Sequence, residues 1–205
     1  KSPEPAWRDR NLRELSKRVI SGAIMAHVRA ASLSSGCLVQ QTNCHPFRYK
    51  QWLFMHNGGI LNYPQVKSDL ILGVDPMLYP FIEGSSDSEI FFYLAITFGL
   101  EKDPLTAMAR AVGFIEKVGR AKGIENPIQM TVAITNGKTL WAFRYSSEGN
   151  SRTLFYSNDE AELLEEYPDD ELLAKLSLGS RMIVSEPIGD LPELWTEVPE
   201  SSCVV

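Results

Sequence analysis

The stretch SDSEIFFYL at residues 86–94 joins a helix-start signal to an apolar run. The Ser86 hydroxyl can accept a hydrogen bond from the Glu89 amide, and the Glu89 side chain can reach back in return, which is the arrangement of a capping box. This signal predicts a helix from about Asp87 to Phe98.

Strands are predicted on both sides of a block of two helices. The second helix of the block starts at Asp103-Pro104 and ends at Gly123. Beyond it, Asn136-Gly137 between two alternating segments is typical of a two-residue type I′ hairpin. The strands predicted in this last third are residues 129–135, 138–145, 153–157, 181–185 and 195–198, with surface helices at 159–167 and 170–178.

The segments before the block predict helices and strands as well. Asp9 or Asn11 can cap a short helix, and Gly22 ends it. A buried strand is predicted at 23–28, a second strand at 51–56 and a helical stretch at 63–72, with an abrupt turn at 57–59 between the last two. The order of strands, paired helices and strands predicts a layered α+β fold rather than an alternating β-α-β fold.

Composition excludes several classes of protein. A chain of 205 residues can bury a full core as one domain. The net charge of −6, without a basic stripe, argues against nucleic acid or an anionic membrane as the main partner. The sequence has no transmembrane-length apolar run and no signal peptide, and its three cysteines lack the spacing of a zinc site or a disulfide framework. We therefore expect a cytoplasmic protein with reduced thiols.

Two charged residues could bind a ligand, although each has an ordinary structural alternative. Arg29, at the end of the first predicted strand, can bind a carboxylate through two parallel hydrogen bonds, or form a surface salt bridge worth about 0–1 kcal/mol. Asp87 lies in the first turn of its helix, where the dipole favours an ionised carboxylate. It can receive a substrate ammonium or only cap the helix.

Two further segments carry polar groups. His56-Asn57-Gly58 places a side-chain amide beside a backbone N–H at a sharp turn, and such donors can stabilise an oxyanion. The alternative is an ordinary turn, which we assign to the same dipeptide at Asn136-Gly137. Cys44 and His45 are adjacent, so their side chains point to opposite sides of an extended chain and are not expected to pair. A packed loop is the favoured interpretation there.

The order of these segments is more specific than any one of them. The chain resembles the class II glutamine amidotransferases through HVRAAS at 27–32, NCHPF at 43–47, HNG at 56–58, SDSE at 86–89 and RMIVSEP at 181–187. The resemblance covers nearly the whole chain. It is closest to the stand-alone bacterial branch, which is similar to the γ-glutamyl hydrolase of ergothioneine biosynthesis, and PAWRDRNL at 5–12 also resembles that branch.

This resemblance implies a fold and a set of roles. The implied fold is a four-layer αββα sandwich of the N-terminal-nucleophile hydrolase type, with two antiparallel sheets between helical layers. It implies one domain over residues 1–205, incomplete at its N-terminus. The implied roles are α-carboxylate binding for Arg29, α-ammonium binding for Asp87, the oxyanion hole for Asn57 and Gly58, a position near the substrate carboxylate for Ser32, and a structural loop beside the pocket for His45.

The nucleophile of this family is an N-terminal cysteine whose own α-amine acts as the general base. An internal thiol has no free α-amine, so Cys37, Cys44 and Cys203 do not qualify. We expect the nucleophile and the first strands to belong to a preceding segment of a longer protein. The implied reaction is hydrolysis of the glutamine γ-amide through a Cys thioester, with release of glutamate and ammonia and without metal or cofactor. A separate protein could accept the ammonia.

Three alternatives stay open. The substrate could be a γ-glutamyl conjugate, because Arg29 and Asp87 would bind the glutamyl end equally well. The domain could bind glutamine or a partner protein without catalysis. A hydrolase built on Cys44 and His45 is a weaker third reading. The oligomeric state cannot be read from the sequence.

Overall fold

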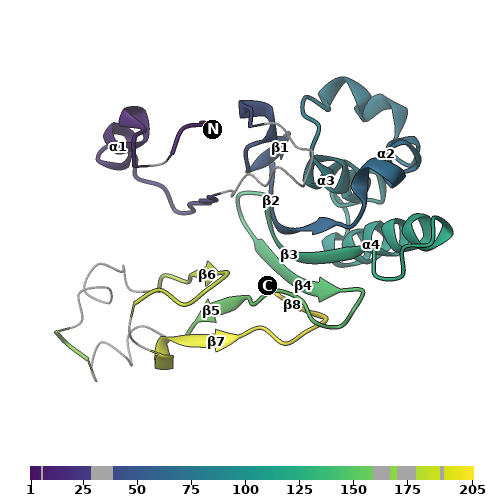
Figure 1. Cartoon of the computed structure of the whole chain (residues 1–205). Helices are drawn as coiled ribbons and strands as arrows, with labels where there is room; N and C mark the ends of the chain where they lie inside the picture. The colour runs from purple at the N-terminus through teal and green to yellow at the C-terminus, as the bar shows by residue number, and fades with distance from the viewer. Residues whose placement is uncertain (6, 29–38, 159–166, 170–178, 190–191) are drawn as a thin grey trace.

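The computed structural model describes residues 1–5, 7–28, 39–158, 167–169, 179–189 and 192–205. It has two antiparallel sheets and a group of helices, which confirms the predicted α+β class (Figure 1). The five-stranded sheet, in order β1-β2-β3-β4-β8, contains β1 (Phe47–Tyr49), β2 (Trp52–Ile60), β3 (Ile128–Thr135), β4 (Leu140–Ser146) and β8 (Ser202–Val204). The three-stranded sheet, in order β6-β5-β7, contains β5 (Phe155–Ser157), β6 (Ile183–Val184) and β7 (Trp195–Glu197). The α-helices are α1 (Arg10–Ser16), α2 (Tyr63–Leu72), α3 (Asp87–Thr97) and α4 (Pro104–Ala121), and short 3₁₀ helices cover Gln41–Asn43, Pro76–Phe81 and Pro192–Leu194.

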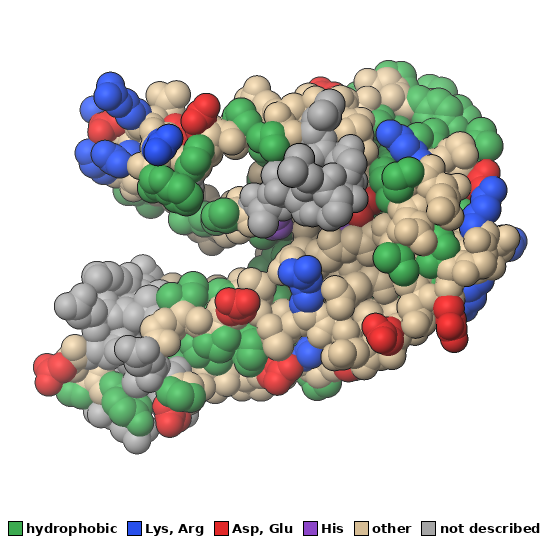
Figure 2. Space-filling view, in the orientation of Figure 1, with side chains coloured by type: hydrophobic (Ala, Val, Ile, Leu, Met, Phe, Trp, Pro, Cys, Tyr) green, Lys and Arg blue, Asp and Glu red, His purple; other side chains and the backbone are tan. Residues whose placement is uncertain are grey.

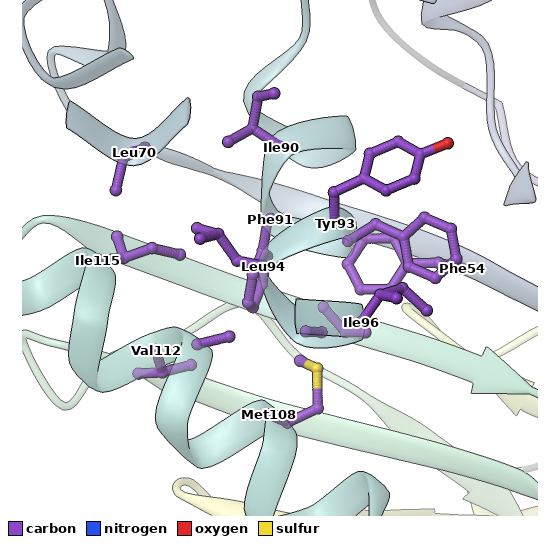
Figure 3. Close-up of a cluster of buried hydrophobic side chains, with 14 of the residues drawn as sticks. Phe54, Leu70, Ile90, Phe91, Tyr93, Leu94, Ile96, Met108, Val112 and Ile115 are labelled. Carbon is purple, nitrogen blue, oxygen red and sulfur yellow. The ribbon is translucent and has the colours of Figure 1, made fainter. Parts of the chain in front are cut away.

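Helix α3 lies at the centre of the main core. The Ser86 hydroxyl accepts a hydrogen bond from the Glu89 amide at 3.2 Å, so the helix begins where the capping signal predicts. Every residue from Ser88 to Ile96 is buried, because α3 packs on β2 and is flanked by α2 and α4. A helix that is apolar on all sides is stable only when it is enclosed in this way. Figure 3 shows this core around Phe91.

Strand β2 has a long partner strand on one edge and a short one on the other. It pairs with β3 from Leu53 to Ile60, whereas β1 pairs with it only from Trp52 to Phe54. Beyond Phe54, no described residue adds a strand to the other edge of β2. The N–H and C=O groups of that edge are therefore available to side chains or ligands.

The two sheets lie on opposite sides of a second, smaller core. Phe143 of β4 belongs to the core under the helices, and its neighbour Ala142 belongs to a cluster with Leu154 and Val198. Since successive residues of a strand face opposite sides, the helices cover one face of the five-stranded sheet and the segments around the three-stranded sheet cover the other. The surface is hollowed between α1 and the three-stranded sheet (Figure 2). The surface helices predicted at 159–167 and 170–178 lie, apart from Tyr167, outside the described residues.

The strand predicted at residues 23–28 is wrong. This segment pairs with none of the described strands, and Ile24 and Val28 are 81% and 80% exposed. An apolar run forms a strand only where a neighbouring strand receives its backbone hydrogen bonds. Asp9 caps α1 as predicted, by accepting from the Leu12 amide at 3.0 Å, but the helix ends at Ser16, well before Gly22.

The hairpin between β3 and β4 is present, but its turn is displaced from the predicted one. The Asn136 amide donates to the Thr139 carbonyl, which places Gly137 and Lys138 at the centre of the turn. The Asn136 side-chain oxygen accepts from the Lys138 and Thr139 amides, both at 2.9 Å, and Gly137 has φ +86°. Asn136 therefore precedes the turn and fixes it with its side chain, rather than occupying a central position.

The packing of α3 predicts a large stability difference between two leucine substitutions. Leu94→Ala removes a side chain with no exposed surface, and we expect it to lower the free energy of unfolding by about 2–5 kcal/mol. Leu72→Ala, at the end of α2 and 76% exposed, is the matched control and should change it by less than about 0.5 kcal/mol. Urea denaturation measures both, and equal losses would contradict the central position of α3.

Candidate active site

The end of β2 and the start of α3 meet at the Asp87 carboxylate. Its Oδ2 accepts a hydrogen bond from the Ile60 amide at 2.8 Å, across 27 positions of the sequence. The same oxygen lies 3.4 Å from the place that a Cβ on Gly59 would occupy. The structure thus brings the Asp87 segment and the end of the Asn57-Gly58 segment together.

The abrupt turn predicted at 57–59 is wrong, because β2 continues through these residues to Ile60 and pairs with β3 there. The two predicted oxyanion donors are therefore adjacent residues of a strand, with different surroundings. Ladder N–H groups alternate in direction, so the Gly58 amide points to the same side as the Ile60 amide, toward the edge that β1 leaves uncovered. The Asn57 side chain lies on the sheet face opposite Phe54 and is half-buried. Its carbonyl oxygen accepts from the Thr131 hydroxyl at 3.2 Å, which fixes the backbone at this point.

Gly58 occupies a position that other residues do not fit. Its φ is +152°, and a Cβ added there would lie 2.0 Å from the Gln129 carbonyl oxygen and 2.7 Å from His56 Nε2. Both distances are shorter than any real contact, so the close approach of β3 and His56 requires a glycine.

The Asp87 carboxylate is held by its own helix as well as by β2. Its Oδ1 accepts from the Ser88 amide at 2.8 Å and faces the Ser88 hydroxyl at 3.3 Å. The first turn of a helix favours a negative charge because the free N–H groups point toward it. The side chain stays half-buried, so it is fixed in place and still reachable.

Side chains also hold the loop that leads into α3. Glu89 does not reach back to the Ser86 amide as the capping box predicts, because its carboxylate accepts from the amides of Glu83 at 2.9 Å and Gly84 at 2.8 Å. Burial raises the pKa of Glu89, and these two amides oppose that shift. The buried Asn43 side chain accepts from the Ser85 amide at 2.8 Å. Neither role was predicted from the sequence.

The loop around His45 has its own contacts. The His45 ring lies 4.2 Å from the His27 ring and 4.7 Å from the Phe47 ring, measured between centroids. Cys44 Sγ lies 3.4 Å from the Gln40 carbonyl oxygen and 3.5 Å from that of Ser2. These contacts of the two neighbours go to different groups. Arg29 and Ser32 lie outside the described residues.

His56 is the residue of this region that the sequence analysis left without a role. Its Nδ1 lies 2.9 Å from the Ser88 hydroxyl, and its Nε2 lies 3.3 Å from the Gln129 carbonyl oxygen. Burial lowers the pKa of His56, and the Asp87 charge opposes that shift. The strand period offered a signal, because it places His56 on the same face as the core residue Phe54.

Other kinds of site have no support in the described part of the chain. No three side chains of His, Cys, Asp or Glu come together there as a metal site. None of the helices that the structure describes has the length and hydropathy needed to cross a membrane.

Comparisons with known proteins place this chain in a family. Residues 2–157 match the model of the class-II glutamine amidotransferases. The chain is similar to a probable glutamine amidotransferase of Saccharomyces cerevisiae, with 30% identity over 224 residues that cover 98% of this chain and 62% of that protein. It therefore spans less than two thirds of that relative's length. It is also similar to the solved structure of a glutamine aminotransferase class-II domain protein from Silicibacter pomeroyi, with a TM-score of 0.76, 31% identity and coverage of 98% of this chain and 77% of that one.

The space around Gly58 and Gly113 predicts opposite effects on stability when each is replaced by alanine. Gly58→Ala forces a methyl group against the Gln129 carbonyl, and we expect it to destabilise the protein by about 1–3 kcal/mol. Gly113→Ala, in the interior of α4 with open space around it, should stabilise the protein by up to about 1 kcal/mol. Denaturation curves decide this, and a Gly58→Ala protein as stable as the parent would refute the close approach.

Proposed function

Since the chain belongs to the class II glutamine amidotransferase family, we propose that the protein hydrolyses the γ-amide of glutamine and releases glutamate and ammonia. The observation that carries this proposal is the position of the Asp87 carboxylate, fixed by the Ile60 amide beside the Asn57-Gly58 end of β2. One anion next to two neutral donors suits a substrate that has an ammonium group and a reacting amide.

Asp87 has the capacity to bind an ammonium group. A carboxylate offers about four lone-pair sites. The Ile60 amide, the Ser88 amide and the Ser88 hydroxyl occupy at most three of them. The remaining site would accept from the α-ammonium of glutamine.

The other predicted residues complete the substrate site in this proposal. Arg29 would bind the α-carboxylate, Ser32 would lie near that carboxylate, and the His45 loop would border the pocket. The Asn57 side-chain amide and the Gly58 N–H would donate to the oxyanion, because both are neutral donors at one point of β2. We assign residues 1–205 to one glutamine amidotransferase domain.

The proposed reaction has two steps with the same charge development. A cysteine thiolate attacks the amide carbon, the carbonyl oxygen becomes an oxyanion, and the C–N bond breaks as the nitrogen takes a proton and leaves as ammonia. Water then attacks the thioester through a second oxyanion and frees glutamate and the thiol. Both oxyanions would form at the same two donors, so one site serves both steps.

We place the nucleophile outside residues 1–205. Cys203 lies on β8, three strand spacings or about 14 Å from β2, and burial raises its pKa to about 11. Cys44 Sγ lies within hydrogen-bond distance of two backbone carbonyls. Cys37 lies outside the described residues. An internal cysteine also lacks the free α-amine that serves as the base in this family.

The oxyanion assignment is tested on the full-length protein with glutamine as substrate. The parent should release ammonia, and Asn57→Ala should lower kcat by about 10²–10³ with little change in KM, because one donor to the oxyanion is lost. Asn136→Ala is the matched control, since the same Asn-Gly dipeptide there only fixes a turn. It should leave kcat unchanged.

Three outcomes would each contradict a different part of the proposal. A full-length parent that releases neither ammonia from glutamine nor the amine from a γ-glutamyl anilide would refute the proposed function. Amine release without ammonia release would instead establish the γ-glutamyl conjugate as the substrate. An unchanged kcat in Asn57→Ala would remove Asn57 from the oxyanion hole.

Asp87→Asn tests the ammonium site. We expect KM for glutamine to rise about 10- to 100-fold, because a hydrogen bond to a charged group is replaced by one to a neutral amide. Asp103→Asn is the control, since Asp103 also accepts from a helix-start amide but lies at the exposed start of α4. Steady-state kinetics on both variants test this prediction. A KM of Asp87→Asn equal to that of the parent would leave Asp87 with a capping role only.

A further inference from the structure

The His56 side chain is enclosed between β2, β3 and α3. It is 2% exposed, and its ring stands edge-on to the Phe91 ring with centroids 5.5 Å apart. A buried imidazole loses its hydration, so its polar atoms need partners in the protein. Both ring nitrogens have such partners, one on β3 and one on α3.

The partners determine where the ring carries its proton. Nε2 faces the Gln129 carbonyl oxygen, which only accepts, so the proton is assigned to Nε2. In the neutral ring Nδ1 is then an acceptor. The Ser88 hydroxyl has one proton and lies 2.9 Å from Nδ1 and 3.3 Å from Asp87 Oδ1, so we assign its hydrogen bond to the nearer Nδ1. This arrangement satisfies both nitrogens without a charge on the ring.

The same ring contacts one half of the proposed active site and is linked to the other half through Ser88. On one side, His56 Nε2 lies 2.7 Å from the place of a Cβ on Gly58, so the ring packs directly against the Gly58 backbone. On the other side, Ser88 follows Asp87 and donates its amide to Asp87 Oδ1 at 2.8 Å. His56 therefore spans the distance between the proposed oxyanion donor and the proposed ammonium-binding carboxylate.

The surroundings keep the ring neutral. Burial lowers the pKa of His56, and Arg152, in the segment before β5, adds to that shift. Asp87 at the start of α3 and the Gln129 carbonyl of β3 act in the opposite direction. Phe54 and Phe91 present apolar rings to it. Since burial is the largest of these effects, the imidazole is uncharged at neutral pH.

We propose that neutral His56, acting through Ser88, is a positioning residue that fixes the separation between the Gly58 amide and the Asp87 carboxylate. This inference rests on the proposed function, because the separation matters only if one substrate bridges both groups. In glutamine the α-ammonium and the γ-amide belong to one short molecule. A shift of either protein group relative to the other therefore weakens the transition-state contacts more than it weakens the fold.

A role in positioning differs from two simpler roles for a buried histidine. A general base needs a free nitrogen within reach of the substrate, whereas both nitrogens of His56 are engaged. A core histidine that only fills space would affect stability and leave the kinetics alone. The Ser88 hydroxyl separates these roles, because its removal breaks the link to α3 and leaves the ring in place.

The test compares Ser88→Ala, Ser88→Thr and Ser157→Ala in the full-length protein. Ser88→Ala should lower kcat/KM for glutamine about three- to tenfold, the value of one lost hydrogen bond, and Ser88→Thr should restore it by keeping the hydroxyl. Ser157→Ala is the matched control. Ser157 is a buried serine of β5 in the three-stranded sheet, away from the proposed site, and its hydroxyl oxygen accepts a hydrogen bond from the Met182 amide. It should lower the melting temperature with kcat/KM unchanged.

A double-mutant cycle tests whether His56 acts through Ser88. His56→Gln keeps a donor toward Gln129 but has no acceptor at the Nδ1 position that faces Ser88, so Ser88→Ala in that background should cause no further loss of kcat/KM. Additive losses would overturn the inference. So would an active parent whose kcat/KM survives Ser88→Ala, whereas a parent that releases no ammonia contradicts the proposed function instead.

Nitrogen-15 spectra give a measurement that needs no activity. The chain has three histidines, and the spectrum of His56→Gln assigns the His56 signals by difference. We expect a neutral ring with its proton on Nε2 at pH 7, and a changed Nδ1 signal in Ser88→Ala. A charged ring, or a proton on Nδ1, would overturn the inference whatever the kinetics show.

Discussion

The hydrogen bond from the Ile60 amide to the Asp87 carboxylate joins the end of β2 to the start of α3, and the geometry of the site depends on it. The bond is possible because β1 stops pairing with β2 after Phe54 and leaves that edge of the strand open. The core sets its length. Phe54 stacks on Phe92 with centroids 5.2 Å apart and meets Phe91 edge-on at 5.6 Å, so α3 cannot slide along β2.

Side chains do the work of backbone pairing in the loop before α3. The Glu89 carboxylate accepts hydrogen bonds from two backbone amides of this loop, and the Asn43 side chain accepts one from a third. The loop is therefore held in place without regular secondary structure. A cluster of buried polar groups is favourable only when each member has partners. Here the cluster fixes the residues directly before Asp87, and this helps to fix the position of the Asp87 carboxylate. Loss of one partner would leave a buried polar group unsatisfied and would move the loop that Asp87 follows.

Features that depend on interactions between near neighbours in the chain were predicted correctly from the sequence. Features that depend on contacts with distant segments were not. The Ser86 cap, the Asp9 cap and the start of α3 depend on neighbours three residues away, and the structure has them as predicted. The strand predicted at 23–28 is wrong because an apolar run does not show whether another strand will pair with it. The predicted hydrogen bond from the Ser86 amide to Glu89 is wrong. The Glu89 carboxylate binds the amides of residues 83 and 84 instead, and those contacts depend on the path of the loop. In the candidate site, the residue types at 57, 58 and 87 were found by resemblance. Their juxtaposition, and the part of His56 in it, follow only from the packing of α3 on β2.

The charge of the site depends on which groups are buried. Asp87 is half-buried at the start of α3, and its carboxylate accepts hydrogen bonds from the Ile60 and Ser88 amides. His56 lies a few atoms away through Ser88, and a charged imidazole there would attract the same carboxylate that the proposed function reserves for a substrate ammonium. Burial among aromatic rings removes that competition, because it costs more to charge the ring than the Asp87 field returns. The aromatic packing that fixes α3 on β2 therefore has a second consequence. It keeps the neighbouring histidine neutral, so that no imidazolium competes with a ligand for the Asp87 carboxylate.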